Sequence, residues 1–552
     1  MLFEPKILGT MKNYSRSQLI SDVMAGLIVA IIALPLSIAF GIASGVSPNQ
    51  SLITAIIAGF IVAGLGGSKV QIAGPTGAFV ILVYGVVTQY GLSGLMTVTV
   101  MAGFILILFG LFKIGDLIKF ISLPLVIGFT AGIAVLIFST QVRDLLGLTI
   151  TGSIPAEFIE KWHVYFTNLN TTNFYALAIS LLTILTIVFL PKLYSKIPSP
   201  FVALVLTTCL VKFLHLPVET IGDRFGQITF SMPQFVLPDF SLPTLKMLFV
   251  PAVTIALLGA IESLLSAVVA DSMINDKHNS NTELIAQGIA NVITPLFGGI
   301  PATGAIARTA TNIKNGGKTP VSGIFHSVFL LLILIAFAPL ISFIPMATLA
   351  GILTTVAYNM SGWRAIRKLL KAPKADIFVL FLTMFLTIVF DLTIAIGTGL
   401  VVLSFNFMNK MNNCSKIKCT SAKCKNNEER SIIDNIELPE DVLIYEPHGA
   451  FFFAVSSKFE AEFKSHIESY KYAVIRMKHI YTIDASGLMI LEDIMKHLKS
   501  CGVEVLLLQI PNGIKQELVQ FGINKMVDEN KIFDDVEKVI EYLENNKKKK
   551  EA

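Results

Sequence analysis

Long apolar blocks follow one another through most of this 552-residue chain, from about Ile20 to Met408. A block of roughly 20 apolar residues is long enough to cross a lipid bilayer as a helix. Composition agrees, because 53% of the residues are hydrophobic and 15% are charged, against about one quarter charged in soluble domains. The mean hydropathy is +0.70. The sequence therefore predicts a polytopic α-helical membrane protein.

Fourteen such blocks can be placed, seven in each half of the apolar region. The first seven are Ile20–Ser44, Leu52–Gly66, Thr76–Tyr90, Leu95–Phe112, Ile118–Thr140, Phe174–Leu190 and Phe201–Leu216. The second seven are Leu248–Ala270, Leu284–Phe297, Thr303–Ile313, Val321–Ala338, Ile341–Tyr358, Ile377–Phe390 and Leu392–Met408. An odd number of spans in each half predicts two repeats of opposite topology, at about 20–217 and 248–409.

The third block of each half has the same unusual beginning. The segments Gly66–Phe79 and Gly298–Thr309 each open with a Gly-Gly pair and continue with a polar stretch and a Pro near the start of a new apolar helix. Matched, interrupted segments in two halves of a membrane protein point to a transporter's binding site. Two helix N-termini there would bring unpaired N–H groups and positive dipole ends into the membrane, which suits an anion. The pattern predicts an anion carrier.

The positive charges predict the orientation of the spans. Lysine and arginine gather in residues 1–19, in the short loop Arg364–Lys374 and after the last block, at Lys410, Lys416 and Lys418. Such clusters belong on the cytoplasmic side, which requires an even number of spans and places both termini in the cytoplasm. The first 19 residues are polar for too long to be a secretory signal. The expected location is the cell (inner) membrane.

The chain changes character after the last apolar block. Residues 410–437 are polar and predict a linker, and residues 438–545 alternate strand and helix patterns, which indicates a small α/β domain. Residues 546–552, with four consecutive lysines, are expected to form a disordered basic tail. Strands are expected at Val442–Tyr445, Phe451–Ala454, Tyr472–Met477 and Val503–Leu508, and helices at Ser486–Lys499, Gly513–Phe521 and Val536–Leu543.

Three motifs resemble those of the SulP anion transporters: Gly128–Gly132, Gly259–Ser266 and Gly304–Ala310. The C-terminal region is similar to a STAS domain. The resemblance implies that the inverted repeats form a core and a gate domain, that the core moves relative to the gate, and that substrate lies between half-helices three and ten. Relatives carry sulfate, bicarbonate or C4-dicarboxylates. A homodimer, a cytoplasmic STAS domain and a cytoplasmic protein partner for it are implied in the same way.

The starts of the two half-helices are the candidate anion site. They offer backbone N–H groups with little side-chain obstruction, from Thr76, Gly77 and Ala78 on one side and from Ala305, Ile306 and Ala307 on the other. The alternative is that these small residues only allow tight helix packing in lipid. Matched positions in both halves favour binding.

Glu262 is the only carboxylate in the block Leu248–Ala270. An ionisable group at that depth is a functional hypothesis by default, and its alternative is a structural carboxylate that hydrogen-bonds a neighbouring helix. The resemblance places Glu262 beside the substrate, with Ser266 one turn on, where a related sodium-coupled bicarbonate carrier has Asp and a hydroxyl residue. Because burial favours the neutral form of a carboxylate, Glu262 favours a proton over sodium as the coupling ion.

Other residues complete the candidate pocket. Arg308 could attract the anion directly or form an ion pair with Glu262 that alternates with substrate. Pro35 is expected to break the first span. By resemblance, Leu36 and Phe40 face the substrate, and Leu36 makes that wall drier than in relatives with a polar residue. His326 is expected to be a hydrogen-bonded packing residue, with a proton relay as the alternative.

Two further features have a functional and a structural interpretation. Ser486 follows Thr482–Ala485 at a strand-to-helix turn and resembles the phosphorylated serine of anti-sigma-factor antagonists, but a helix N-cap is the preferred role. Cys414, Cys419 and Cys424 recur at equal spacing, yet that spacing fits no common zinc pattern and no fourth ligand is evident. We therefore expect no metal and no cofactor.

The sequence as a whole predicts a proton-coupled secondary transporter of a small anion, working by an elevator-like movement. No Walker-type phosphate loop is present, which argues against ATP-driven transport. A sodium-coupled carrier, an uncoupled exchanger or channel, a nucleobase carrier of similar architecture and a membrane-anchored sensor with a STAS output are the alternatives. Neither an enzyme nor a nucleic-acid binder is expected.

Overall fold

The computed structural model of the chain describes residues 3–116, 122–150, 155, 157–194, 198–226, 235, 238–390, 392–421, 439–453 and 470–551. These residues form two compact units, Met1–Val401 and Val402–Ala552. The first unit holds the apolar helices and the second holds the α/β domain, and each is described by itself.

The first repeat has the predicted order of segments. It contains α2 (Arg16–Ala43), α3 (Pro48–Leu65), β1 (Ala73–Gly74), α4 (Gly77–Leu111), α5 (Leu123–Leu146), α7 (Phe174–Leu193) and α8 (Ser199–Phe213). Short α1 (Lys6–Thr10), α6 (Phe158–Thr167) and α9 (Ile221–Phe225) lie before or between them. The third and fourth predicted blocks are both in α4, which kinks at Gly91 (φ 68°).

The second repeat matches it segment by segment. It contains α10 (Leu242–Ile274), α11 (Ser280–Leu296), β2 (Thr303–Gly304), α12 (Ile306–Lys314), α13 (Pro320–Ile341), α14 (Met346–Met360), α16 (Lys374–Val389) and α17 (Leu392–Cys414), with the short α15 (Trp363–Leu369) before α16. With α4 counted as two segments, these helices give the fourteen spans of the inverted-repeat fold. Seven of the described helices are long and apolar enough to cross a membrane by length and composition alone.

One prediction about the first span is wrong. Helix α2 continues through Pro35 from Arg16 to Ala43 without a break. Proline is tolerated inside membrane helices, since neighbouring helices, side chains and local adjustments satisfy the backbone groups that it frees. The beginnings of α2 and α3 are fixed by capping boxes at Ser15 and Ser47, which satisfy otherwise unpaired N–H groups.

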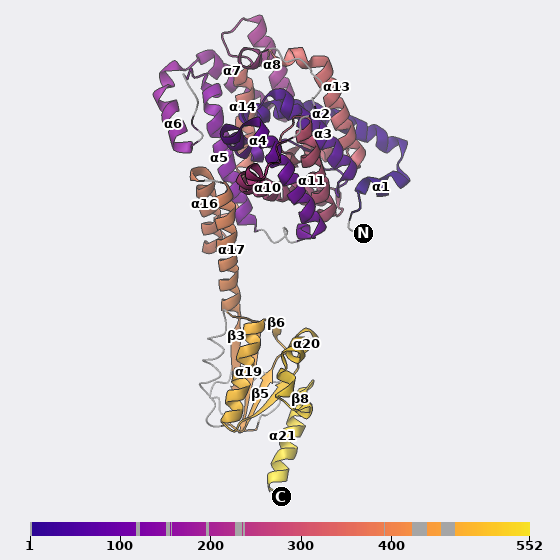
Figure 1. The fold of residues 1–552 in the computed structure, drawn as a ribbon, viewed down its shortest axis with the longest axis vertical. Coiled ribbons are helices and arrows are strands. Elements are labelled where there is room, and N and C mark those ends of the chain that lie inside the picture. The colour runs from indigo at the N-terminus through magenta and orange to yellow at the C-terminus, as the bar shows by residue number, and fades with distance from the viewer. Residues whose placement is uncertain are drawn as a thin grey trace. The chain divides into compact units, whose positions relative to one another are not determined.

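The helices of the first unit sort into two packed groups (Figure 1). In the core group, α2 and α3 pack against α13, and α4 packs against α10 and α11. In the gate group, α5 packs against α14 and α16, and α14 also packs against α7. Contacts between the groups run mainly from α2 to α14 and from α4 to α5. The half-helix starts at β1 and β2 belong to the core group.

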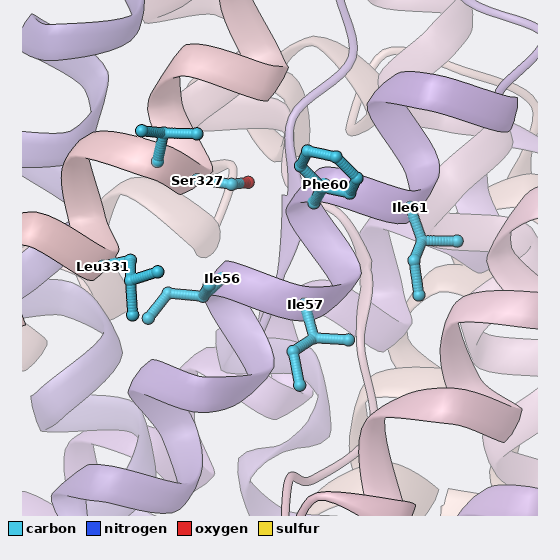
Figure 2. A pocket seen from close by; sticks show the side chains of 7 residues that line it. Ile56, Ile57, Phe60, Ile61, Ser327 and Leu331 are labelled. Atoms are coloured by element: carbon cyan, nitrogen blue, oxygen red, sulfur yellow. The ribbon is translucent and has the colours of Figure 1, made fainter. Parts of the chain in front are cut away.

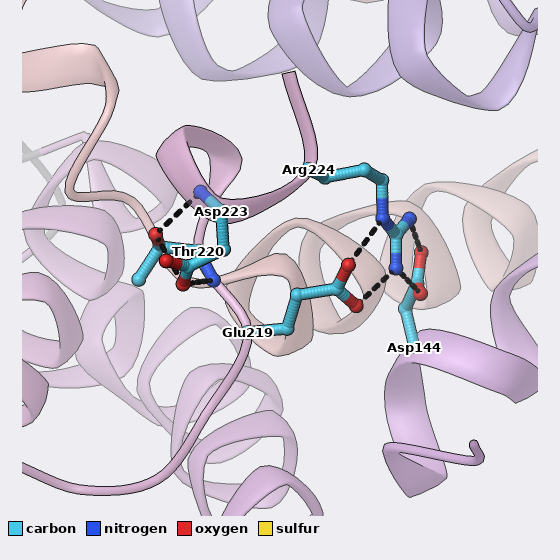
Figure 3. A network of polar contacts seen from close by, with 5 residues as sticks. All are labelled: Asp144, Glu219, Thr220, Asp223 and Arg224. Carbon is cyan, nitrogen blue, oxygen red and sulfur yellow. Dashed lines mark hydrogen bonds and ion pairs between the residues drawn. The ribbon is translucent and has the colours of Figure 1, made fainter. Parts of the chain in front are cut away.

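A polar network ties the gate group together at the end of α5 (Figure 3). The Arg224 guanidinium donates to both carboxylate oxygens of Asp144, at 2.6 and 3.1 Å, and to both of Glu219, at 2.5 and 2.8 Å. The Thr220 backbone pairs with Pro345 immediately before α14. These contacts link α5 and the segment of α9 to the start of α14.

The second unit is the predicted α/β domain. Its sheet has the order β3-β4-β5-β7-β8, with β6 paired to β4, and only the β3–β4 pair is antiparallel. The strands are β3 (Lys416–Ser421), β4 (Val442–Phe451), β5 (Tyr472–Arg476), β6 (Ile480–Ile483), β7 (Glu504–Leu508) and β8 (Ile532–Phe533), and the helices are α19 (Ala485–Ser500), α20 (Asn512–Phe521) and α21 (Val536–Glu551).

Two expectations for this region need correction. The predicted linker 410–437 begins with the end of α17 and with β3, because β3 completes the sheet by pairing with β4; residues 422–438 lie outside the described part. The tail expected to be disordered continues α21 to Glu551.

Candidate functional site

The two glycine-framed segments meet inside the core group. Strand β1 pairs antiparallel with β2, with Ala73 opposite Gly304 and Gly74 opposite Thr303. Helix α4 begins three residues after β1, and α12 begins two residues after β2. All four strand residues are buried. The pairing therefore brings two helix N-termini from different halves of the chain to one place.

Neither of the two helix N-termini is capped by a side chain. Neither Thr76, the N-cap of α4, nor Ala305, the N-cap of α12, forms a side-chain cap. The Thr76 hydroxyl is buried and has no hydrogen-bond partner among the described residues. One predicted donor is not available, since the Ala305 N–H donates to the Ile72 carbonyl at 2.8 Å. The two helix starts therefore differ in their free donors, because the pairing of β1 with β2 uses one N–H group at the start of α12.

Arg308 extends from α12 to the opposite segment. Its Nη2 donates to the Pro75 carbonyl at 3.1 Å and to the Ser37 hydroxyl at 3.2 Å. The side chain is 2% exposed, and Nη1 has no hydrogen-bond partner among the described residues. A Cβ built on Gly74 would lie 2.5 Å from Nη1. Glycine at position 74 therefore makes room for the guanidinium.

The start of α4 faces residues of both groups. A Cβ on Gly77 would lie 3.3 Å from Phe40 of α2, 3.1 Å from Ile137 of α5 and 2.9 Å from the Met360 sulfur of α14. Phe40 belongs to the core group, whereas Ile137 and Met360 belong to the gate group. The first half-helix thus begins at the boundary between the two groups.

The remaining predicted pocket residues differ in exposure. Leu36 is buried, as are Thr76, Ala78 and Ala305, whereas Ile306 and Ala307 are exposed. The second half-helix start is therefore the more open of the two.

Glu262 lies on α10 and is 8% exposed. In the part of the chain that the structure describes, its carboxylate has no hydrogen bond and no ion pair, and none with Arg308. The predicted ion pair between the two is therefore absent from this arrangement. Ser266, one turn on, donates to the Thr309 hydroxyl at 3.3 Å, and Thr309 accepts the Ile72 N–H at 3.0 Å. Ser266 thus connects α10 to the half-helix rather than to Glu262.

A second buried carboxylate, Glu283 on α11, was missed from the sequence. It is fully buried and accepts four hydrogen bonds, which come from the Gly67 and Ser68 N–H groups at 2.9 and 3.1 Å and from the Gln71 and Gln287 side chains at 3.0 and 3.1 Å. The Gln71 amide also donates to Ser263 of α10 at 2.8 Å. The sequence shows Glu283 only as a carboxylate at the start of the ninth block, and three of its four partners lie more than 200 residues away.

Two smaller predictions come out differently, and a third, on the cysteines, is not tested. His326 is fully buried, as expected, but neither ring nitrogen has a hydrogen-bond partner among the described residues. The N-cap of α19 is Asp484, whose carboxylate accepts the Gly487 N–H at 2.8 Å, so the cap assigned to Ser486 is wrong. Cys414 is a free thiol at the end of α17, and Cys424 lies outside the described residues; Cys419 is on β3.

Comparison with known proteins agrees with this architecture. A family model described as the sulfate permease family matches residues 19–383, and one described as the STAS domain matches residues 435–539. The chain is 40% identical to the putative sulfate transporter YvdB of Bacillus subtilis, over 95% of this chain and 98% of that protein. It is 31% identical to the bicarbonate transporter BicA of a Picosynechococcus strain, over 80% of each.

Solved structures show the same fold. The transmembrane domain of a cyanobacterial BicA covers 70% of this chain and 98% of that one, with a TM-score of 0.64 and 32% identity. Murine Slc26a9 in an inward-facing state covers 98% of this chain and 94% of that one, with a TM-score of 0.86. At 16% identity, this second likeness is one of fold alone.

Proposed function

Because the chain belongs to the sulfate permease family, we propose that it is a secondary active transporter that binds a small anion where β1 and β2 cross. The proposal rests above all on one observation: two helix N-termini without side-chain caps meet at that crossing beside a buried guanidinium. Unpaired N–H groups and positive dipole ends favour an anion. Relatives named as sulfate and bicarbonate transporters support the same class of substrate.

In this proposal the anion accepts from the N–H groups of Thr76, Gly77 and Ala78 on one side and of Ile306 and Ala307 on the other. Arg308 supplies a fixed positive charge, and its Nη1, which has no partner among the described residues, is the atom that would contact the anion. Leu36 and Phe40 form the apolar wall. Sulfate, bicarbonate and C4-dicarboxylates all fit this chemistry.

We assign the coupling role to Glu262. A buried carboxylate without a partner is costly when charged, so it is stable when it holds a proton and poised to lose one when the site meets water. Ser266 donates its hydroxyl to Thr309 and not to Glu262, so the preference for a proton over sodium rests on the buried carboxylate itself. A proton bound at Glu262 and an anion at the half-helices would then move together.

The movement is an elevator-like displacement of the core group against the gate group. It is supported by the position of Gly77, which lies in the core group and faces Ile137 and Met360 of the gate group. Sliding at this boundary would expose the site to either side in turn. The lysine and arginine clusters support a cytoplasmic position for both termini and for the STAS domain. The STAS domain is a protein-interaction domain, and we propose a homodimer for the assembly.

Uptake into liposomes tests the proposal. The purified protein is reconstituted, and labelled sulfate, bicarbonate, fumarate and succinate are offered with a pH gradient or a sodium gradient imposed separately. We expect saturable uptake of one of these anions, driven by the pH gradient alone. Uptake that neither gradient drives would contradict the proposed coupling to protons. If none of the four anions is taken up saturably, the result would favour a membrane-anchored sensor over a transporter.

The matched variant is Glu262→Gln, which keeps the shape of the side chain and removes the titration. It should lose the dependence on the pH gradient, while exchange of internal for external anion continues. Coupling that survives this change would place the proton elsewhere.

A further inference from the structure

The N-terminal segment closes a basic cavity on the core group. The cavity has a volume of about 910 Å³ and is lined by four parts of the chain that are distant in sequence. These are the segment from Phe3 to Gln18, Lys69 after α3, residues 277–279 between α10 and α11, and residues 318–319 before α13. The first part includes α1 and the start of α2. The others follow the C-terminal ends of α3 and α10 and precede the N-terminal end of α13, so the cavity lies at one end of the core group.

The lining carries five lysines and one glutamate, Glu4. Two of the lysines have partners, because Lys6 donates to the Lys277 carbonyl at 2.8 Å and Lys69 pairs with Asp276 at 2.8 Å. The ammonium groups of Lys12, Lys277 and Lys318 have no partner among the described residues. Like charges gathered around one cavity repel each other unless an anion neutralises them.

The cavity is built into the fold. The Lys6 N–H donates to the Gly66 carbonyl at 3.0 Å, and the Glu4 N–H donates to Thr282 at 3.1 Å. Tyr14 donates to the Asp22 carboxylate at 3.0 Å, and burial together with this hydrogen bond raises the pKa of Tyr14 to about 12. Asp22 also accepts from the Thr319 hydroxyl at 2.6 Å. The N-terminal segment is thereby held against both repeats.

An apolar groove lies between α3 and α13, two of the helices whose ends border the cavity (Figure 2). It has a volume of about 300 Å³ and lies between α3 and α13, with Ser327 as the only polar residue in its lining. Phe60 at its edge is 51% exposed. Helix α1 packs against both α3 and α13. The rest of the groove is lined by Ile56, Ile57, Ile61, Val328 and Leu331.

The spacing of the two features matches one kind of ligand. Thr319 lines the cavity and Ser327 lines the groove, and eight residues of helix correspond to about 12 Å along the axis. We propose that the cavity and the groove together bind one anionic phospholipid, with its phosphate headgroup among the lysines and an acyl chain between α3 and α13.

The surroundings favour a lipid over a soluble phosphate. Leu8 and Met11, next to the cavity, are 67% and 53% exposed, as is typical of a segment that rests in a membrane interface. A free phosphate would use the lysines alone and would leave the groove without a role. Basic pockets between membrane helices are known to bind phospholipid headgroups.

Native mass spectrometry of the delipidated full-length protein tests the proposal. Phosphatidylglycerol is titrated against phosphatidylcholine of the same acyl chains, and inorganic phosphate and pyrophosphate are added as competitors. We expect one phosphatidylglycerol to bind with preference. The triple variant Lys12→Gln, Lys277→Gln, Lys318→Gln should weaken that binding by on the order of 100-fold, as three lysines near an anionic headgroup would predict.

The control is Lys368→Gln, Lys371→Gln, Lys374→Gln, which removes three exposed lysines around α15 and α16. This control variant should keep its preferential binding of phosphatidylglycerol. An equal loss of binding in both triple variants would show that only the net charge of the protein matters, and it would overturn the proposal. Val328→Trp, which fills the groove without changing charge, should also weaken binding. Full displacement by pyrophosphate with no effect of Val328→Trp would identify a soluble phosphate instead. None of these measurements depends on transport.

Discussion

Glu262 and Glu283 are two buried carboxylates of the same core group, and their surroundings are opposite. Glu283 accepts four hydrogen bonds from α11 and from the segment after α3. Glu262, on α10, has none among the described residues. A buried charge with full hydrogen bonding holds elements together, whereas one without partners is costly and persists only where it has another use. Burial alone therefore does not separate a structural carboxylate from a functional one.

The largest expected effect is on folding, at Glu283. Glu283→Ala leaves two N–H groups and two amides buried without their acceptor, and each unsatisfied group costs about 1–3 kcal/mol. We expect a variant that unfolds well below the wild type or fails to accumulate, measured by thermal unfolding in detergent. Glu283→Gln, which keeps one acceptor oxygen, should be intermediate. If Glu283→Ala unfolded at the same temperature as the wild type, Glu283 would not have the structural role that distinguishes it from Glu262.

Glu262→Gln should have the reverse profile. Because no hydrogen bond is lost, we expect its thermal stability to equal or exceed that of the wild type, within about 0.5 kcal/mol. Transport driven by a pH gradient should nevertheless disappear. Thermal unfolding and gradient-driven uptake are measured on the same preparation. A clear loss of stability would show that Glu262 has a structural role like that of Glu283.

An intermediate effect is expected at Gly74. Gly74→Ala places a Cβ 2.5 Å from Arg308 Nη1 and displaces the guanidinium from the crossing. Anion uptake should fall about tenfold, as expected when a charge-assisted contact worth about 1.5 kcal/mol is lost, with KM raised. Some stability should be lost as well, because Gly74 has a φ of 157°, where a side chain strains the backbone. Gly64→Ala on α3, where a Cβ meets nothing within 4 Å, is the control. Equal uptake kinetics in the two variants would show that Arg308 does not contact the anion.

The smallest effect is expected at a third carboxylate, Glu219 in the gate group. The hydrogen bond from Arg224 lowers the pKa of Glu219 below its usual value, against the effect of burial. A lowered pKa in the folded state stabilises the protein above the unfolded value near 4.5, and this stability is lost as the pH falls through the folded value. Glu219 is 44% exposed, so the contribution is small.

Melting temperatures at pH 7 and pH 4 measure this contribution. The difference between the wild type and Glu219→Gln should be visible at pH 7 and should shrink at pH 4. A difference that grows on acidification would mean that the pair with Arg224 is not what stabilises this side chain.

The alternation of apolar blocks was sufficient to predict the fold. Fourteen spans, the repeats and the α/β domain follow from residue type and period, because a membrane helix must be apolar over its length. The matched glycine-framed segments also predicted the two half-helices. Pro35 and the tail after Asn545 were misjudged, since neighbouring helices and helix extension override local preference there.

The sequence by itself determined which residues could be buried, charged or open at a helix start. Only the tertiary structure decided which of them have partners. Glu283 accepts hydrogen bonds from Gly67 and Gln71 of the other repeat. The Ala305 N–H donates to Ile72. Arg308 donates to the Pro75 carbonyl and forms no ion pair with Glu262. These contacts join residues more than 200 positions apart, and the pairing of β1 with β2 that brings the half-helices together leaves no local trace in the sequence.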